Sequence, residues 1–225
     1  FTPKGTLGFS KLAMVFQQFA SDHYFTAGES FQDMISDGRV WLLTKMEIQV
    51  IKQPQIGANL VLYTWSNRFF NGKAYREFLL KDKNHDFIYG QTEWVHFDLK
   101  NLKKLYLDKD IKIDFPKYDF SLFENDISTW KIQPENEPVE TLEYSLRYND
   151  FDILNHMNNT RYFEFIEDYC FKNACNIKNI KIQYKKEVPL ALNKIALSIF
   201  NKEESSILLL ITSEDITYSL GEVLL

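Results

Sequence analysis

Residues 10–27 carry apolar side chains at steps of three and four, the period of one face of an α-helix. This face contains Leu12, Val15, Phe16, Phe19 and Ala20. Ser10 is a residue type that commonly caps a helix N-terminus, and Gly28 is a common signal for a helix end. The pattern therefore predicts a first helix over Ser10–Ala27.

The apolar period then changes from the helical value to two. Over Val40–Val50 the even positions are mostly apolar, whereas the odd positions include Lys45 and Glu47. This alternation predicts a strand with a single buried face. Three further strands are predicted over Leu60–Trp65, Ala74–Leu80 and Phe87–Phe97. The Asn71-Gly72 pair indicates a hairpin turn among them.

Periodicity is lost over residues 101–140, which contain Pro116, Pro134 and Pro138. This composition predicts a linker that runs over the surface. After it the periodic pattern restarts. The second half is predicted to contain a short strand over Glu143–Arg147, a helix over Asn159–Cys175, and strands over Ile177–Lys186, Ile195–Phe200, Ile207–Thr212 and Ile216–Leu224.

The order of one helix followed by four strands thus occurs twice. A long helix wrapped by an antiparallel sheet is an α+β arrangement known as the hot-dog. We therefore expect two tandem hot-dog units over residues 1–100 and 141–225, joined by the linker 101–140. The chain starts at Phe1 and ends inside the apolar run Val223–Leu225, so we expect sequence to be missing at both ends.

Composition and charge narrow the function classes. The chain of 225 residues has a formal net charge of -5, which makes a nucleic-acid binder less favoured. It has no run of about 18 apolar residues, so no membrane span is expected. Cys170 and Cys175 are too few for a disulfide framework and match no zinc spacing, which favours a reducing, cytoplasmic location and no metal.

The most informative segment joins the short second-half strand to the second predicted helix. Asn158 and Asn159 are candidate N-caps, and the free N–H groups of the first helical turn can hold negative charge such as an oxyanion. His156 can accept or donate a proton near neutral pH, and Asp152 could orient a neighbouring side chain. An ordinary capped helix with a structural histidine is the alternative, but the cluster Asp-x3-His-x-Asn-Asn favours chemistry.

This segment resembles the signature of the acyl-acyl-carrier-protein thioesterases. The matching residues are Arg147, Asp150, Asp152, His156, Asn158, Asn159 and Tyr162. First-half segments around Trp41, Trp65 and Trp94 are also similar to that family, and the Ile182–Glu187 segment resembles the part that carries an acidic catalytic residue. The resemblance therefore extends over most of the chain, and it implies a tandem hot-dog thioesterase.

The chain departs from the family pattern at two positions. Leu154 stands where the family usually has an Asn, and Asn155 follows one residue later. A shift of one residue turns a side chain to the other face of an extended backbone, so Asn155 replaces the missing amide only if the loop bends differently. Val188 stands where plant members have a Cys, so no thiol nucleophile is present there and attack by water is the simpler mechanism.

The resemblance implies hydrolysis of fatty acyl thioesters of acyl carrier protein, with release of free fatty acid and without a cofactor. His156 and Glu187 would activate the water, and Asp152 would hold the loop through His156 or Asn155. Residues 1–10 align with the signature but contain no His or carboxylate, so a single catalytic site is expected in the second lobe. The first lobe would form the acyl pocket.

The remaining site predictions concern binding. Asn158 and Asn159 would bind the oxyanion, Trp41 would line the acyl tunnel, and Lys185 and Lys186 would dock the acidic carrier protein. Two alternatives remain open at this point, an acyl-coenzyme A thioesterase and a non-catalytic acyl-binding hot-dog protein. A dehydratase fits less well. Because two lobes can pair within one chain, either a monomer or a homodimer is expected.

Overall fold

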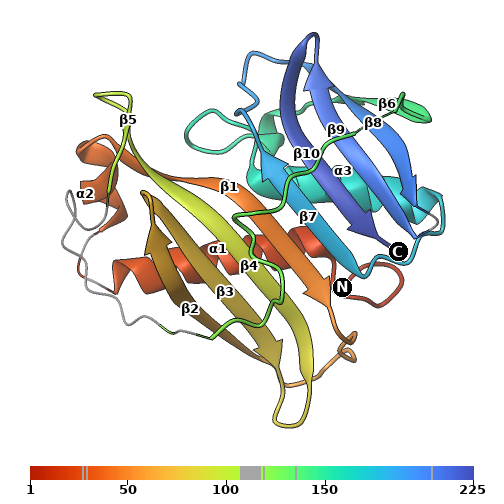
Figure 1. Cartoon of the computed structure of the whole chain (residues 1–225), viewed down its shortest axis with the longest axis horizontal. Coiled ribbons are helices and arrows are strands. Elements are labelled where there is room, and N and C mark those ends of the chain that lie inside the picture. The colour runs from red at the N-terminus through yellow and green to blue at the C-terminus, as the bar shows by residue number, and fades with distance from the viewer. Residues whose placement is uncertain (27, 29, 107–117, 119, 135, 204) are drawn as a thin grey trace.

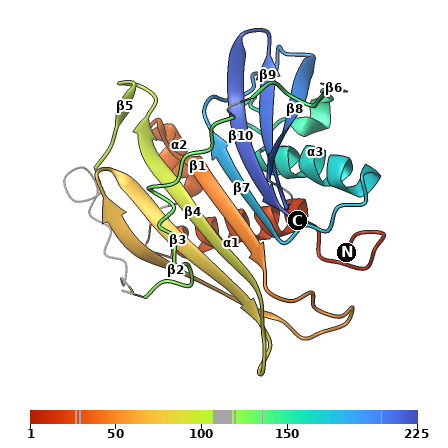
Figure 2. The same cartoon turned by 45° about the vertical axis from the view of Figure 1, so that its right-hand side comes forward.

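The computed structural model describes residues 1–26, 28, 30–106, 118, 120–134, 136–203 and 205–225. Two long helices pack on one face of a large antiparallel sheet (Figures 1 and 2). The helices are α1 (Phe9–Phe25), α2 (Phe31–Ser36) and α3 (Asn159–Lys172), with a 3-10 turn at Tyr148–Asp150. The strands are β1 (Arg39–Val50), β2 (Val61–Phe70), β3 (Lys73–Lys81), β4 (Asp86–Asp98), β5 (Lys103–Lys104), β6 (Glu140–Ser145), β7 (Asn179–Tyr184), β8 (Lys194–Glu203), β9 (Ser206–Ser213) and β10 (Ile216–Leu224).

The sheet follows the order β2-β3-β4-β1-β7-β10-β9-β8-β6, with β5 paired to β4. α1 lies against the half built from β1 to β4, and α3 lies against the half built from β6 to β10 (Figure 1). This α+β arrangement confirms the expected pair of hot-dog units. The two halves join edge to edge where β1 pairs with β7, for example at Met46 opposite Ile182. Residues from both helices and both halves form one hydrophobic core.

The N-terminus of α1 differs from its sequence prediction. Gly8, not Ser10, is the N-cap, and it makes no side-chain cap. Glu167 of α3 takes that role, because its carboxylate accepts from the N–H groups of Phe9 at 2.6 Å and Ser10 at 3.0 Å. A negative charge at a helix N-terminus is favourable, so α3 stabilises α1 directly. A contact between elements 157 residues apart could not be inferred from the local sequence.

The buried stripe of α1 is rotated around the helix relative to the predicted one. Leu12, Phe16 and Ala20 are buried as expected, but Val15 and Phe19 are 39% and 40% exposed. The stripe also includes Phe9, Ala13 and Tyr24, so its centre lies between Phe16 and Ala20. Val15 and Phe19 fall on the flank of that stripe, at the limit of the arc that a helix can bury. The prediction for these two side chains was therefore wrong.

Phe16 fixes how closely α1 approaches the sheet. Its ring stacks on Phe78 of β3 with centroids 4.5 Å apart. Gly90 of β4 leaves the space that this ring fills, since a Cβ atom there would lie 2.3 Å from Phe16 Cε2. Inserting carbon into a packed core forces shifts that typically cost about 1–3 kcal/mol. We expect Gly90→Ala to lower the free energy of unfolding by about that amount, measured by denaturant unfolding.

Gly221 of β10 provides the matched control. It is also a sheet glycine under a helix, but its Cβ would lie 3.5 Å from Ile166 of α3, which is ordinary contact. Gly221→Ala should therefore leave the free energy of unfolding nearly unchanged or raise it slightly. Equal destabilisation by the two substitutions would contradict the close approach of Phe16.

The outer face of the first-lobe sheet is covered by residues 120–132, here called the strap. The prediction that only one face of β1 is buried was wrong, because Lys45 and Glu47 are buried. Lys45 Nζ donates to the carbonyl oxygens of Ile127, Ser128 and Trp130 in the strap, at 2.8, 3.2 and 3.0 Å. These acceptors replace the water that a buried ammonium group loses.

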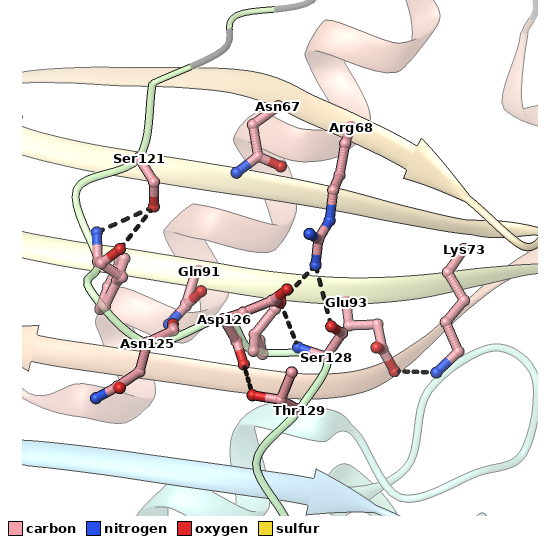
Figure 3. A network of polar contacts seen from close by, with 12 residues as sticks. Asn67, Arg68, Lys73, Gln91, Glu93, Ser121, Asn125, Asp126, Ser128 and Thr129 are labelled. Carbon is pink, nitrogen blue, oxygen red and sulfur yellow. Dashed lines mark hydrogen bonds and ion pairs between the residues drawn. The ribbon is translucent and has the colours of Figure 1, made fainter.

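Further polar contacts hold the strap on the strands (Figure 3). Arg68 pairs with Asp126, and Gln91 Nε2 donates to the carbonyl of Asn125 at 3.4 Å. Part of the segment expected to be a surface linker thus covers a second buried layer. Residues 107–117, 119 and 135 of that linker lie outside the described residues, as does Ala27 of the first predicted helix.

The second half follows the predicted order with shifted boundaries. β6 ends at Ser145, before the predicted end at Arg147, and α3 ends at Lys172, before Cys175. Ala174 has a φ of 55°, which is outside the helical range and accounts for the early end. α2 and β5 were not anticipated. None of the helices in the described part of the chain is long and apolar enough to cross a membrane.

Candidate active site

The approach to α3 is anchored by Asp150. This carboxylate is buried, accepts from the N–H of Arg147 at 2.8 Å and pairs with Arg161 Nε at 3.1 Å. The carbonyl of Asp150 also accepts from the N–H of Asn158 at 2.9 Å. Because these bonds fix both ends of the loop, Asp150 and Arg147 of the signature hold its shape.

Asp152 closes the turn that carries His156. Its Oδ1 accepts from the N–H groups of Leu154 at 2.8 Å and His156 at 3.2 Å. Its own N–H donates to the carbonyl of His156 at 2.9 Å. Asn155, between them, has a φ of 62°, which Asn tolerates better than most residues. The N–H of Asn155 also donates to the Asp152 carbonyl at 3.0 Å, so Asp152 bonds to the backbone of both expected partners, His156 and Asn155.

His156 and Glu187 lie side by side. Their Nδ1 and Oε2 atoms are 3.1 Å apart, and the side chains are 34% and 48% exposed. Backbone bonds fix this approach, since Met157 N–H donates to Val188 O and Leu190 N–H donates to Asn155 O, both at 2.9 Å. The segment after β7 is therefore paired with the signature loop.

Both side chains line a cavity of about 320 Å³ between the two lobes. Trp41 and Thr44 contribute from β1, and Asn159 and Tyr162 contribute from α3. Tyr184 packs edge-on against Tyr162, with centroids 5.0 Å apart, and its hydroxyl donates to the carbonyl of Asn159 at 3.1 Å. Burial, and to a lesser extent the charge of Glu187, raises the pKa of Tyr162, so its phenol stays protonated.

Asn158 already accepts hydrogen bonds from two of the backbone N–H groups at the N-terminus of α3. Its Oδ1 accepts from Thr160 N–H at 2.9 Å, and its carbonyl accepts from Arg161 N–H at 2.9 Å. Asn158 caps the helix and lines neither cavity described here. Asn159 lines both of them, and its amide donates to Gln17 Oε1 at 3.2 Å.

Asn155 likewise is not brought to either cavity, whereas Leu154 lines both. The Asp152 turn points the Leu154 position inward and leaves Asn155 in the left-handed region. The replacement of the family Asn by Leu154 therefore changes the cavity wall itself. Lys185 and Lys186 are exposed and stand at the rim of the cavity that holds His156.

A second cavity of about 240 Å³ lies under α1 and shares Trp41, Asp152, Leu154 and Asn159 with the first. Its other lining includes Tyr24, Phe25, Phe31, Met34, Ile35 and Phe69. Apolar lining with few polar groups is typical of small-molecule sites. Sequence reasoning missed the contribution of α2, although Phe31, Met34 and Ile35 follow helical spacing and Ser30 caps them by accepting from Asp33 N–H.

Comparison with known families follows the two halves of the chain. Residues 3–114 match the acyl-ACP thioesterase N-terminal domain, and residues 133–222 match the acyl-ACP thioesterase C-terminal domain. The fold and the signature thus define a tandem hot-dog thioesterase architecture. The chain belongs to the acyl-ACP thioesterase family, as its sequence pattern predicts.

Curated relatives agree with this assignment. The chain is 22% identical over 186 residues to a chloroplastic palmitoyl-acyl carrier protein thioesterase of Arabidopsis thaliana, which covers 76% of this chain and 45% of that protein. It is also 22% identical over 172 residues to a chloroplastic acyl-[acyl-carrier-protein] hydrolase of Cuphea viscosissima, covering 72% and 42%. The chain therefore spans less than half the length of these relatives.

Solved structures share the fold. An acyl-ACP thioesterase from Bacteroides thetaiotaomicron aligns with a TM-score of 0.78 at 22% identity, over 100% of this chain and 92% of that chain. The 12:0-ACP thioesterase from Umbellularia californica aligns with a TM-score of 0.73 at 15% identity, over 98% and 90%. At such identities the likeness establishes the arrangement of the two lobes.

Proposed function

We propose that this protein hydrolyses fatty acyl thioesters of acyl carrier protein and releases the free fatty acid. The observation that carries the proposal is the His156–Glu187 pair, 3.1 Å apart, on a cavity that adjoins an apolar one. The membership of the chain in the acyl-ACP thioesterase family supports the same chemistry. The thioester would lie beside the pair, and the acyl chain would extend under α1.

In the proposed mechanism, His156 and Glu187 orient a water molecule and remove its proton. The water oxygen attacks the thioester carbonyl carbon, the carbon–sulfur bond breaks, and the thiol leaves with a proton returned by His156. The negative oxygen of the intermediate is held at the N-terminus of α3. Since Thr160 and Arg161 N–H groups already donate to Asn158, the proposal assigns this role to the N–H of Asn159.

The deciding experiment is an assay of the purified protein with acyl carrier protein thioesters of varied chain length. Coenzyme A thioesters of the same acyl chains, and also aromatic coenzyme A thioesters, are offered in competition. Preferred turnover of the carrier-bound series supports the proposal, and preferred turnover of the coenzyme A series favours the first alternative. Saturable acyl binding without turnover of either series would leave only an acyl-binding role.

Carrier docking makes a separate prediction about charge. Lys186 is exposed at the cavity rim, where it can meet an acidic carrier protein. Exposed charge pairs are screened over about 10 Å at 0.1 M salt, so carrier-bound turnover should weaken as salt rises. We expect Lys186→Glu to raise the apparent KM several-fold and to change kcat less, because a rim charge acts on encounter.

The control is Lys52→Glu. Lys52 is exposed and follows the Val50 end of β1, whereas the cavity that holds His156 is lined by the part of β1 near Trp41. Lys52 lines neither cavity. It should leave KM for the carrier-bound substrate unchanged. Salt-independent kinetics, or equal effects of the two reversals, would argue against docking at this rim and would favour coenzyme A esters.

A further inference from the structure

Four residues line both cavities, namely Trp41, Asp152, Leu154 and Asn159. The proposed function places the acyl chain in the cavity under α1 and the reacting carbon beside His156. The thioester oxygen, which is bonded to that carbon, then lies where the two cavities meet. A hydrogen-bond donor for this oxygen is therefore best placed on one of the four shared residues.

Of these four residues, Asn159 offers the accessible donors. Leu154 has an apolar side chain, and the Asp152 carboxylate is an acceptor that would repel an oxyanion. Trp41 Nε1 is a donor, but this atom is buried away from solvent. The backbone N–H groups of Asp152 and Leu154 are already used, since they donate to the His156 carbonyl and to Asp152 Oδ1. Asn159 can contribute its backbone N–H and, from its side chain, Nδ2.

The carboxamide of Asn159 is oriented by Gln17 of α1, across the interface between the two lobes. Gln17 Nε2 donates to the carbonyl oxygen of Ala13 at 3.3 Å. Because that carbonyl can only accept, it leaves Gln17 Oε1 to face Asn159, whose Nδ2 donates to it at 3.2 Å. Gln17 therefore holds the donor nitrogen of Asn159, and not its carbonyl oxygen, on the α1 side of the site.

Both donors of Asn159 are held in place before a substrate binds. Tyr184 holds the backbone, since its hydroxyl donates to the Asn159 carbonyl at 3.1 Å. An amide nitrogen has two N–H groups, and the second N–H of Asn159 Nδ2 has no other partner among the described residues. A donor that is already oriented needs no reorganisation when negative charge develops on the substrate oxygen. A carboxamide turned the other way would present an oxygen to that charge and would repel it.

We propose that Gln17 of the first lobe is a positioning residue for the thioester hydrolysis of the second lobe. It orients the Asn159 carboxamide, so that Nδ2 joins the Asn159 backbone N–H in holding the negative oxygen of the intermediate. This inference rests on the proposed function and specifies how the first lobe contributes to the chemical step at the same site.

The test is a double-mutant cycle of Gln17→Met and Asn159→Ala, with kcat and KM measured for one acyl carrier protein thioester. Asn159→Ala removes the carboxamide and keeps the backbone N–H, and loss of one oxyanion donor typically lowers kcat by about 10²- to 10³-fold. Gln17→Met keeps a long side chain but frees the carboxamide to rotate, so we expect kcat to fall at least about tenfold. KM should change less than about twofold in each variant, because the interaction forms only in the transition state. In the Asn159→Ala protein, Gln17→Met should have little further effect.

Two controls separate positioning from stability. Gln18→Met changes the neighbouring glutamine, which is exposed, donates to Asp22 Oδ1 at 2.7 Å and lines neither cavity, so kcat should be unchanged. Glu167→Ala removes a different contact between the two helices, the cap that α3 provides for the N-terminus of α1. It should lower Tm and leave kcat unchanged.

Additive losses of kcat in the cycle, or wild-type kcat in either folded single variant, would overturn the inference. A loss confined to KM would do the same, since it would mark Asn159 as a group that binds the ground state. Asn159→Ala leaves α1 intact, so it tests the donor whether or not Gln17→Met folds. Failure of the wild-type protein to hydrolyse any acyl thioester would instead overturn the proposed function.

Discussion

His156→Ala and Glu187→Gln are each expected to lower kcat for acyl thioester hydrolysis by about 10²- to 10⁴-fold, the usual contribution of general acid–base catalysis. The two side chains are 3.1 Å apart and line one cavity, so they can act on the same water molecule. Groups that act as a unit give non-additive losses. The double variant should therefore be little slower than the slower single variant. Single-turnover kinetics with a saturating substrate would measure the chemical step.

The cysteines provide the control for this mechanism. Cys170 and Cys175 lie at and beyond the end of α3 and line neither cavity. Cys175→Ser and Cys170→Ala should leave kcat nearly unchanged, and thermal unfolding would check that all the variants remain folded. An essential cysteine would contradict attack by water. Full activity of the His156→Ala protein would remove this site from the mechanism.

The order of elements could be predicted because each long element carries its own hydrophobic period. The two helices and the strands that follow each of them reproduce the predicted order. The joining of the halves into one sheet could not be predicted in this way. The pairing of Met46 with Ile182 links strands that are far apart in the sequence, and a local pattern states only that each side chain is buried.

Lys45 and Glu47 show why the second buried layer escaped prediction. In a strand, alternation of polar and apolar residues usually means that the polar face is exposed to solvent. Here the strap covers the polar face of β1. Glu47 accepts from Asn179 at 2.7 Å and from Gln91 at 2.6 Å, so its burial is matched by hydrogen bonds from two other strands. Such compensation depends on residues distant in sequence.

Residues of the candidate site could be predicted from the sequence only where they stand in a recognisable motif. His156, Asp152 and Glu187 stand in motifs, and the structure brings His156 and Glu187 together. The choice between Leu154 and Asn155 depends on backbone geometry: Asn155 has a positive φ in the turn that Asp152 closes, and Leu154 lines the cavities. Arg76 stands in the segment Arg76-Glu77-Phe78, whose spacing resembles the family pattern, but its place in the cavity wall could be seen only in the folded structure.

Asp152→Ala is expected to lower kcat by roughly 10²-fold, because small misplacements of a catalytic group can cost that much. Asp152 holds His156 through the backbone, by accepting from the N–H groups of Leu154 and His156. Alanine removes both bonds and loosens the turn under the imidazole. Asp152→Asn keeps an oxygen acceptor at the same place, so we expect it to restore kcat to within about tenfold of the wild-type value. The ratio of kcat for Asp152→Asn to kcat for Asp152→Ala measures how much the backbone hydrogen bonds contribute to the positioning of His156.

Asp82 provides the matched control for the loss of such a turn. Its Oδ1 accepts from the N–H groups of Asn84 and His85, both at 2.7 Å, in the hairpin between β3 and β4. Asp82→Ala should cost a similar amount of stability, measured as Tm, with kcat unchanged, because this hairpin lines neither cavity. If Asp152→Asn were as slow as Asp152→Ala, the charge of Asp152 would matter for the chemical step itself. In that case the carboxylate would act on His156 or on the water, and the backbone bonds to Leu154 and His156 would not account for its role.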